Sequence, residues 1–301
     1  MNARRQIQPL AIAARVRYDT WRRLLLAVAF LLLLINPALN YFFGITFVQG
    51  WFQSLGIGEL RLISPLEGME SLLVTRQFSF STLIGMLIPL LLAVLLGRVF
   101  CSWICPISFL AETVAVVRQR IAREKNLRDR LVLARRVLWF TLIAELLLSL
   151  VLGAPLFVFL SPPGLVGREL MMAVYFRNLA WEGVLIIVIV LLELLTRRFS
   201  CRYFCPLGGL LALVGMVRRL VIRRHAESCT GCGRCDRACP LGLAPSRDES
   251  LSAYCWNCGM CVDSCDHGAL AFCWRGGPVA TGQGRGDAPP PSAMIGVIEK
   301  K

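Results

Sequence analysis

Two runs of closely spaced cysteines near the C-terminus constrain this chain more than any other feature. Each run has the spacing C-x2-C-x2-C-x3-C, and Pro240 follows the first run directly. In two-cluster ferredoxins this spacing holds a pair of [4Fe–4S] clusters, and the fourth cysteine of each run ligates the other cluster. We therefore predict a small α+β ferredoxin-like domain with crossed ligation. The predicted ligand sets are Cys229, Cys232, Cys235 and Cys265 for one cluster, and Cys255, Cys258, Cys261 and Cys239 for the other.

Zinc and disulfides are the alternatives for these eight cysteines. Paired C-x2-C motifs also bind zinc, and even numbers of cysteines can form a disulfide framework. A structural zinc site needs only four ligands, so it does not account for an eight-cysteine register that occurs as two matched runs. Cys273, the odd one among the 13 cysteines, has no partner in spacing and is expected to have a structural role.

The rest of the chain is too apolar for an ordinary soluble domain. Hydrophobic residues make up 56% of the 301 residues, and the mean hydropathy is +0.62. Arg22 and Arg23 before the first apolar segment resemble a twin-arginine export signal, but no small-residue cleavage site follows, so we expect an uncleaved helix. The predicted fold class is a membrane all-α domain with four transmembrane helices, at residues 24–43, 80–96, 137–160 and 179–196.

Basic residues alternate in number between these segments. The N-terminal tail carries six, the following three loops carry two, nine and two, and seven lie between the fourth segment and the first cluster cysteine. The positive-inside rule then predicts that both termini and the clusters lie in the cytoplasm, where thiols stay reduced. The net charge of +14 is not gathered on a nucleic-acid-binding motif, so no nucleic-acid partner is expected.

The membrane part also contains an internal repeat. The motif Arg-x2-Cys-x3-Cys-Pro occurs at Arg98–Pro106 and again at Arg198–Pro206, 100 residues later. Each copy follows a predicted helix pair, which indicates two pseudo-repeats related by an axis along the membrane normal. The outer loops of the two pairs contain Ser-Pro at residues 64–65 and 161–162, and interfacial stretches follow the motifs at residues 107–121 and 207–222.

Four cysteines of the repeated motif are the next candidate site. If the local backbone is helical, Cys101 and Cys105 share a face, as do Cys201 and Cys205. Pseudo-symmetry would then bring the four thiols together at the cytoplasmic rim. We interpret them either as ligands of a third metal or Fe–S centre or as a redox-active thiol site. The alternative is that they are small buried apolar side chains, as free cysteines often are.

Two carboxylates lie inside predicted spans, Glu145 in the third and Glu193 in the fourth. Ionisable groups at this depth usually mark function, so both are candidate proton-relay residues. Glu193 could instead pair with Arg197 at the membrane surface. The two histidines, His225 and His267, lie outside the spans, which excludes bis-histidine haem in the membrane.

The composition divides the chain into four parts. A basic cytoplasmic tail at residues 1–23 precedes the transmembrane domain at residues 24–222, and the ferredoxin-like domain follows at residues 223–274. Residues 275–301 are rich in Gly, Pro and Ser and are predicted to be a flexible tail.

Taken together, four helices, two CxxxCP motifs and a C-terminal two-cluster domain resemble the NapH/MauN family of ferredoxin-type membrane proteins. The closest local matches are Phe100–Pro106 and the segment from Ser161-Pro162 to Met172. The resemblance implies a quinol dehydrogenase subunit of the bacterial inner membrane. Its substrate would be quinol, and its partners an Fe–S protein and c-type cytochromes leading to a system such as periplasmic nitrate reductase.

A second function is also implied by the resemblance. MauN-type members belong to methylamine utilisation, so a maturation or redox-sensing factor without quinol turnover is the alternative. The chain departs from the family pattern at Asp266, where proline usually follows the last cluster cysteine, at residues 107–112 and in the C-terminal tail. These departures leave the pathway and the direction of electron flow open.

Overall fold

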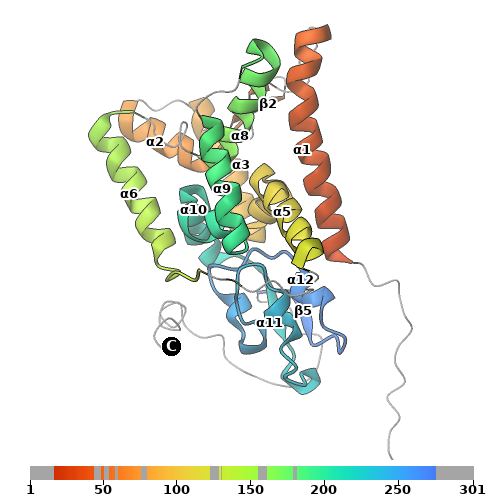
Figure 1. The fold of residues 1–301 in the computed structure, drawn as a ribbon. Coiled ribbons are helices and arrows are strands. Elements are labelled where there is room, and N and C mark those ends of the chain that lie inside the picture. Colours follow the sequence, from red (N-terminus) through yellow and green to blue (C-terminus); the bar gives the residue numbers. More distant parts are fainter. Residues whose placement is uncertain are drawn as a thin grey trace, which may run out of the picture.

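The computed structural model places a helical unit on top of a small α+β unit (Figure 1). The helical unit runs from Tyr18 to Val217, and the small unit from Leu220 to Trp274. The predicted tail at residues 275–301 lies outside the described residues except for Arg275. The structure describes residues 17–43, 49–50, 54–57, 60–75, 80–122, 129, 131–154, 161–178 and 182–275.

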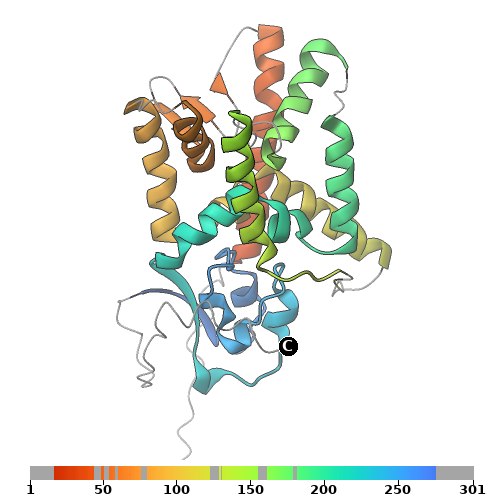
Figure 2. The ribbon, with the colours of Figure 1, turned by 90° about the vertical axis from the view of Figure 1, so that its left-hand side faces the viewer.

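Four apolar helices stand roughly upright in the helical unit, as Figure 2 shows. They are α1 (Tyr18–Phe43), α3 (Phe80–Leu96), α6 (Val137–Leu152) and α9 (Glu182–Leu195). Among the described helices only α1 is long and apolar enough by itself to cross a membrane. The other three contain 17, 16 and 14 residues. Of the four expected membrane-spanning helices, only α1 has the full length of a span among the described residues.

Two helix boundaries differ from the sequence expectation for physical reasons. Helix α1 begins at Tyr18 rather than Leu24, because Arg22 and Arg23 form ion pairs with Asp19 in its first turn. Helix α6 ends at Leu152 rather than Leu160, because Gly153 adopts a left-handed conformation (φ 64°) that ends the helix. Residues 155–160 of the expected span lie outside the described residues.

The internal repeat is visible in the order of elements. In the first copy α2 (Pro65–Thr75) and α3 lead to α4 (Val99–Trp103) and α5 (Pro106–Ala122). In the second copy α8 (Pro162–Met171) and α9 lead to the π-turn η2 (Ser200–Phe204) and α10 (Pro206–Val214). The two copies interlock, because α5 packs on α9 and α10 packs on α3 and α6. A three-stranded antiparallel sheet precedes α2, and short helical turns follow α8 and α10: β1 (Gln49–Gly50), β2 (Ser54–Ile57), β3 (Leu60–Ile63), η1 (Met172–Phe176) and η3 (Gly215–Val217).

The small unit is closed by one antiparallel strand pair. Strand β4 (Leu220–Arg224) pairs with β5 (Leu270–Trp274), so the pairing starts three residues before the expected domain boundary at residue 223. Helices α11 (Arg234–Ala238) and α12 (Met260–Asp263) each begin inside a cysteine run and pack on each other. Three single turns complete this unit: η4 (Ala226–Ser228), η5 (Pro245–Arg247) and η6 (Glu249–Leu251).

The two units share one core. Trp139 Nε1 donates to Tyr254 Oη at 2.6 Å, and the side chain of Asn257 donates to Leu96 O at 2.8 Å. The Tyr18 ring packs edge-on against Phe272 with centroids 5.0 Å apart. Cysteines of the repeated motif and of the second cysteine run lie in the same buried cluster. The small unit is therefore docked directly against the repeated motifs.

Candidate functional site

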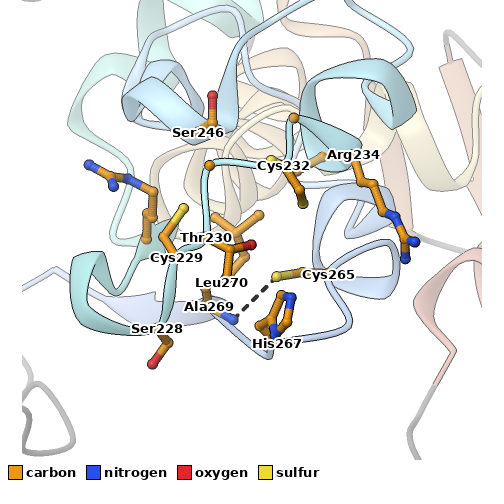
Figure 3. Close-up of a pocket in the computed structure, with 14 residues that line it drawn as sticks. Ser228, Cys229, Thr230, Cys232, Arg234, Ser246, Cys265, His267, Ala269 and Leu270 are labelled. Carbon is orange, nitrogen blue, oxygen red and sulfur yellow. Dashed lines mark hydrogen bonds between the residues drawn. The ribbon is translucent and has the colours of Figure 1, made fainter.

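The outer cysteine group comprises Cys229, Cys232, Cys235 and Cys265. All four line one open hollow of the small unit (Figure 3). Cys265 Sγ accepts a hydrogen bond from Ala269 N at 3.3 Å, and Cys232 is exposed. Gly231 and Gly233 have φ of 68° and 66°, left-handed conformations that let the loop curl around the hollow. The structure therefore groups these cysteines in the predicted crossed set.

The inner cysteine group comprises Cys239, Cys255, Cys258 and Cys261. All four are buried. Burial raises the pKa of Cys239 to about 12, and the nearby Cys258 and Cys255 thiols act in the same direction. Burial likewise raises the pKa of Cys261, and the next largest contributions come from Cys258, Cys255 and Cys239. Cys239 thus lies with the second run, as the crossed arrangement predicts.

The repeat cysteine group comprises Cys101, Cys105, Cys201 and Cys205, and the structure brings these four together. Burial, together with the adjacent Cys101 and Cys205 thiols, raises the pKa of Cys105 to about 12. Burial also raises the pKa of Cys201, with contributions from Glu193, Cys105 and Cys205. Two thiols from each copy of the repeat therefore lie near one another.

The backbone conformation that brings these four thiols together differs from the helical one assumed in the sequence analysis. Cys101 lies in α4, but α4 ends at Trp103, and Cys105 stands immediately before Pro106 at the start of α5. A proline cannot continue a helix and disfavours helical backbone in the residue before it. Cys205 likewise follows η2 and caps α10, accepting from Gly208 N at 3.4 Å. The thiols meet because the chain turns at each proline, so the predicted shared helix face is wrong.

Buried hydrogen-bond donors lie near all three cysteine groups. They indicate whether anionic clusters would fit there. Nε atoms of Arg22, Arg98, Arg218 and Arg224, together with Trp256 Nε1, are buried without a hydrogen-bond partner among the described residues. Such donors cost about 1–3 kcal/mol each when unsatisfied. Arg22 lies near Cys258, Arg218 near Cys255, Arg98 near Cys101 and Cys205, and Arg224 near Cys229.

This donor set fits iron–sulfur clusters held by thiolates, because hydrogen bonds to the sulfurs are a regular feature of such sites. Within the described ranges, no three His, Cys, Asp or Glu side chains approach closely enough to hold a single metal ion. The outer group instead lines a hollow with four thiols around it. The four cysteines of each ferredoxin-type group would hold one [4Fe–4S] cluster, and those of the repeat group are candidate ligands of a third centre.

The two predicted carboxylates occupy different places. Glu193 is 5% exposed, accepts from Ser200 N at 3.3 Å and lies near Cys201, so the structure adds it to the repeat cysteine group. The predicted alternative, a pair between Glu193 and Arg197, is wrong because Arg197 pairs with Asp129 at 3.3 Å. Glu145 is half-buried on α6, and its Oε1 has no partner among the described residues.

His267 and Cys273 lie in the small unit rather than in the helical unit. His267 lines the outer hollow beside Cys265 (Figure 3). Cys273 lies in β5 opposite Val221 and is half-buried. The place of Cys273 is compatible with the structural role expected for it.

Sequence reasoning missed the charged and aromatic residues between the cysteine groups. The guanidinium carbons of Arg98 and Arg198 lie 5.7 and 5.8 Å from the ring centroid of Trp256. Glu112 of α5 pairs with Arg198 and with Arg22, the latter at 2.9 Å. The signal for the arginines was present, since each one precedes a CxxxCP motif at the same position.

Comparisons with known proteins agree with an iron–sulfur protein. A family model described as a 4Fe-4S binding domain matches residues 78–124 and again residues 179–225, which agrees with the predicted repeat. These segments contain the repeat cysteine group and end before the first ferredoxin-type run.

Three relatives match along most of the chain. The ferredoxin-type protein NapH of Haemophilus influenzae is 30% identical over 86% of this chain and 90% of its own length. The methylamine utilization ferredoxin-type protein MauN of Methylobacillus flagellatus is 32% identical over 73% of this chain and 77% of its own. NapH of Escherichia coli is 27% identical over 77% of this chain and 82% of its own. No solved structure matches this chain.

Proposed function

This chain belongs to the NapH/MauN family of ferredoxin-type iron–sulfur electron-transfer proteins, and we propose that it is a quinol dehydrogenase subunit embedded in the bacterial inner membrane. Electrons from quinol would pass through the chain to a partner redox protein. The observation that carries this proposal is the convergence of the repeat cysteine group beside the inner cysteine group, at the base of four apolar helices.

The outer faces of these helices support a membrane location. Leu32 of α1 is 63% exposed, Leu87 of α3 60%, Val151 of α6 80% and Ile187 of α9 60%. Soluble monomers rarely expose such contiguous apolar surface, whereas lipid covers it at no cost. Because α3, α6 and α9 are shorter than the roughly 20 residues of a standard span, the bilayer would thin locally or flanking residues would reach to its surface. With the positive-inside rule, this gives a multi-pass protein with both termini and the clusters in the cytoplasm.

The residues around the repeat cysteine group suit quinol oxidation. Bound iron–sulfur centres would supply one-electron acceptors there. Quinol gives up two electrons and two protons when it becomes quinone, so the site also needs proton acceptors. Glu193 lies beside Cys201 and can accept one proton, and Glu145 on α6 is the second candidate. Ionisable groups at this depth usually belong to such relays.

The outer cysteine group suits electron exchange with another protein, because its hollow lies at the edge of the molecule and Cys232 is exposed. From the family resemblance, we propose as partners an Fe–S protein and c-type cytochromes of a pathway such as periplasmic nitrate reduction. The similarity to MauN supports a second candidate, a maturation or redox-sensing factor that does not turn over quinol.

Electron paramagnetic resonance (EPR) and iron analysis test this proposal directly. The protein is purified anaerobically in detergent and measured before and after addition of a reduced quinol analogue. We expect [4Fe–4S] signals that grow when quinol is added. Clusters that are reduced by dithionite but ignore quinol would contradict the quinol dehydrogenase and favour the maturation or sensing factor.

Matched cysteine variants locate the third centre. Cys201→Ser should lower the iron content and stop reduction by quinol, whereas Cys273→Ser, which changes a half-buried cysteine outside the three groups, should alter neither. Unchanged iron content and quinol reduction in Cys201→Ser would refute a redox role for the repeat cysteine group.

A further inference from the structure

Trp256 fills the boundary between the repeat cysteine group and the inner cysteine group. It is 1% exposed and lies in the loop between Cys255 and Cys258. Its backbone oxygen accepts a hydrogen bond from Ser102 Oγ at 3.2 Å, and Ser102 directly follows Cys101. The residue thus touches the segment that carries one cysteine group while belonging to the loop of the other.

Two guanidinium groups hold the indole ring. Arg98 and Arg198 occupy the same position in the two copies of the repeat, and their guanidinium carbons lie 5.7 and 5.8 Å from the ring centroid. Both are nearly fully buried, at 2% and 3% exposure. Cation–π contacts strengthen when the charge is desolvated. The repeat therefore supplies a clamp for a residue of the ferredoxin-type unit.

Each arginine is also tied to its surroundings. Arg98 donates to Tyr254 O at 3.5 Å and lies beside Cys101 and Cys205. Arg198 pairs with Glu112, donates to Ser108 O, and lies near Glu193 and Cys258. A buried cation costs several kcal/mol unless it is paired, yet two nitrogen atoms of Arg98 have no partner among the described residues. An anionic centre on the adjacent thiols would satisfy them.

We propose that Trp256, in cation–π contact with both Arg98 and Arg198, is the contact through which electrons pass between the repeat cysteine group and the inner cysteine group. This inference rests on the proposed function, because it requires a redox centre on each group. One electron leaves the donor centre, which is oxidised, and reduces the acceptor centre. No bond forms or breaks, no proton moves, and Trp256 itself keeps its oxidation state. The order of electron transfer is then from the repeat cysteine group to the inner cysteine group and from there to the outer cysteine group.

The first test changes the ring and measures the reduction rate of the inner cluster by freeze-quench EPR. With the quinol analogue as reductant, Trp256→Leu should slow reduction of the inner cluster by about tenfold, equivalent to about 1.4 kcal/mol in the barrier. Trp256→Phe, which keeps an aromatic ring in the clamp, should recover most of the rate. Trp274→Leu is the matched control, since Trp274 is 55% exposed on β5. Equal rates in Trp256→Leu and wild type, with equal iron content, would overturn the proposal.

The second test does not depend on quinol and so separates this inference from the proposed function. In a dithionite titration followed by EPR, Arg98→Gln and Arg198→Gln should each lower the midpoint potential of the inner cluster, because a buried cation favours the more negative reduced state. A tenfold change in the redox equilibrium corresponds to about 59 mV for one electron. Arg98→Lys and Arg198→Lys keep the charge and should keep the potential.

Arg219→Gln is the control, because it removes the same charge from an exposed side chain. Unchanged potentials in both Arg→Gln variants would contradict the electrostatic role of the clamp even if quinol never reduces the wild-type protein. A shifted midpoint potential in a protein that quinol does not reduce would support the electrostatic role of Arg98 and Arg198. It would contradict quinol as the substrate.

Discussion

The inner and outer cysteine groups have the same sequence spacing and opposite surroundings. The four inner cysteines are buried beneath the helical unit, and Arg22, Arg98, Arg198 and Arg218 lie around them. The outer cysteines line a hollow at the edge, where the ion pairs Arg224–Asp248 and Arg234–Asp266 are more exposed. Cysteines with the same spacing thus form one buried and one more exposed group, because the helical unit covers only the inner cysteine group.

The largest difference is expected from removing one ligand in each group. Cys258→Ala removes a thiol from the core shared by both units, so we expect loss of the inner cluster and loosening of the contact between the units. Cys232→Ala removes an exposed thiol, so we expect loss of the outer cluster alone. Iron per protein, EPR signals and limited proteolysis measure the two outcomes. Equal losses of iron and equal proteolysis in both variants would contradict the difference between the two groups.

An intermediate difference is expected from removing one arginine near each group. Arg22 is 1% exposed and pairs with Asp19 and Glu112, so Arg22→Leu removes one partner from each of two partly buried carboxylates and should cost about 1–3 kcal/mol. Arg234→Leu breaks an exposed pair worth about 0–1 kcal/mol. Thermal unfolding in detergent compares them, and the smaller loss should vanish at high salt. A larger loss for Arg234→Leu would contradict the assigned roles.

The smallest difference is expected at two glycines with the same backbone conformation. Gly259 (φ 80°) and Gly233 (φ 66°) precede α12 and α11, so alanine at either should cost about 1–2 kcal/mol in backbone strain. At Gly259 the added Cβ would also lie 2.6 Å from Tyr18 Cβ, whereas at Gly233 it meets only Arg237 Nη1 at 3.4 Å. Gly259→Ala should therefore have the lower unfolding midpoint. Equal unfolding midpoints would show that α1 shifts and relieves this contact.

Much of the site could be predicted because its determinants are local. The spacing of eight cysteines predicted two crossed sets, and the structure groups the same residues, while the ligation itself stays a prediction. The bounds of α3 agree with its apolar segment, Phe80–Leu96. The repeated motif could be recognised by comparing the chain with itself, and the matched family model agrees with that repeat.

Other features depend on partners far away in the chain. Asp19, Arg22 and Arg23 resemble a charged tail in sequence. They join α1 because Glu112 pairs with both arginines and Asp263 accepts a hydrogen bond from Asp19 N. The direction of Cys105 and Cys205 follows from chain turns before prolines, which a helical pattern did not anticipate. Arg98 and Arg198 were visible as a repeated residue, yet their common contact with Trp256 was not.

The sequence by itself determined which thiols can act together, because loops with two- and three-residue spacers confine their cysteines to one short turn. It also determined the apolar segments and the repeat. Only the tertiary structure decided which cysteine group is buried, which arginines face it and where the two units meet. Burial and charge pairing arise between residues such as Arg98 and Trp256, which are far apart in the chain, so no local pattern specifies them. The interlocked repeat brings them together, and the environment of each redox site follows from that packing.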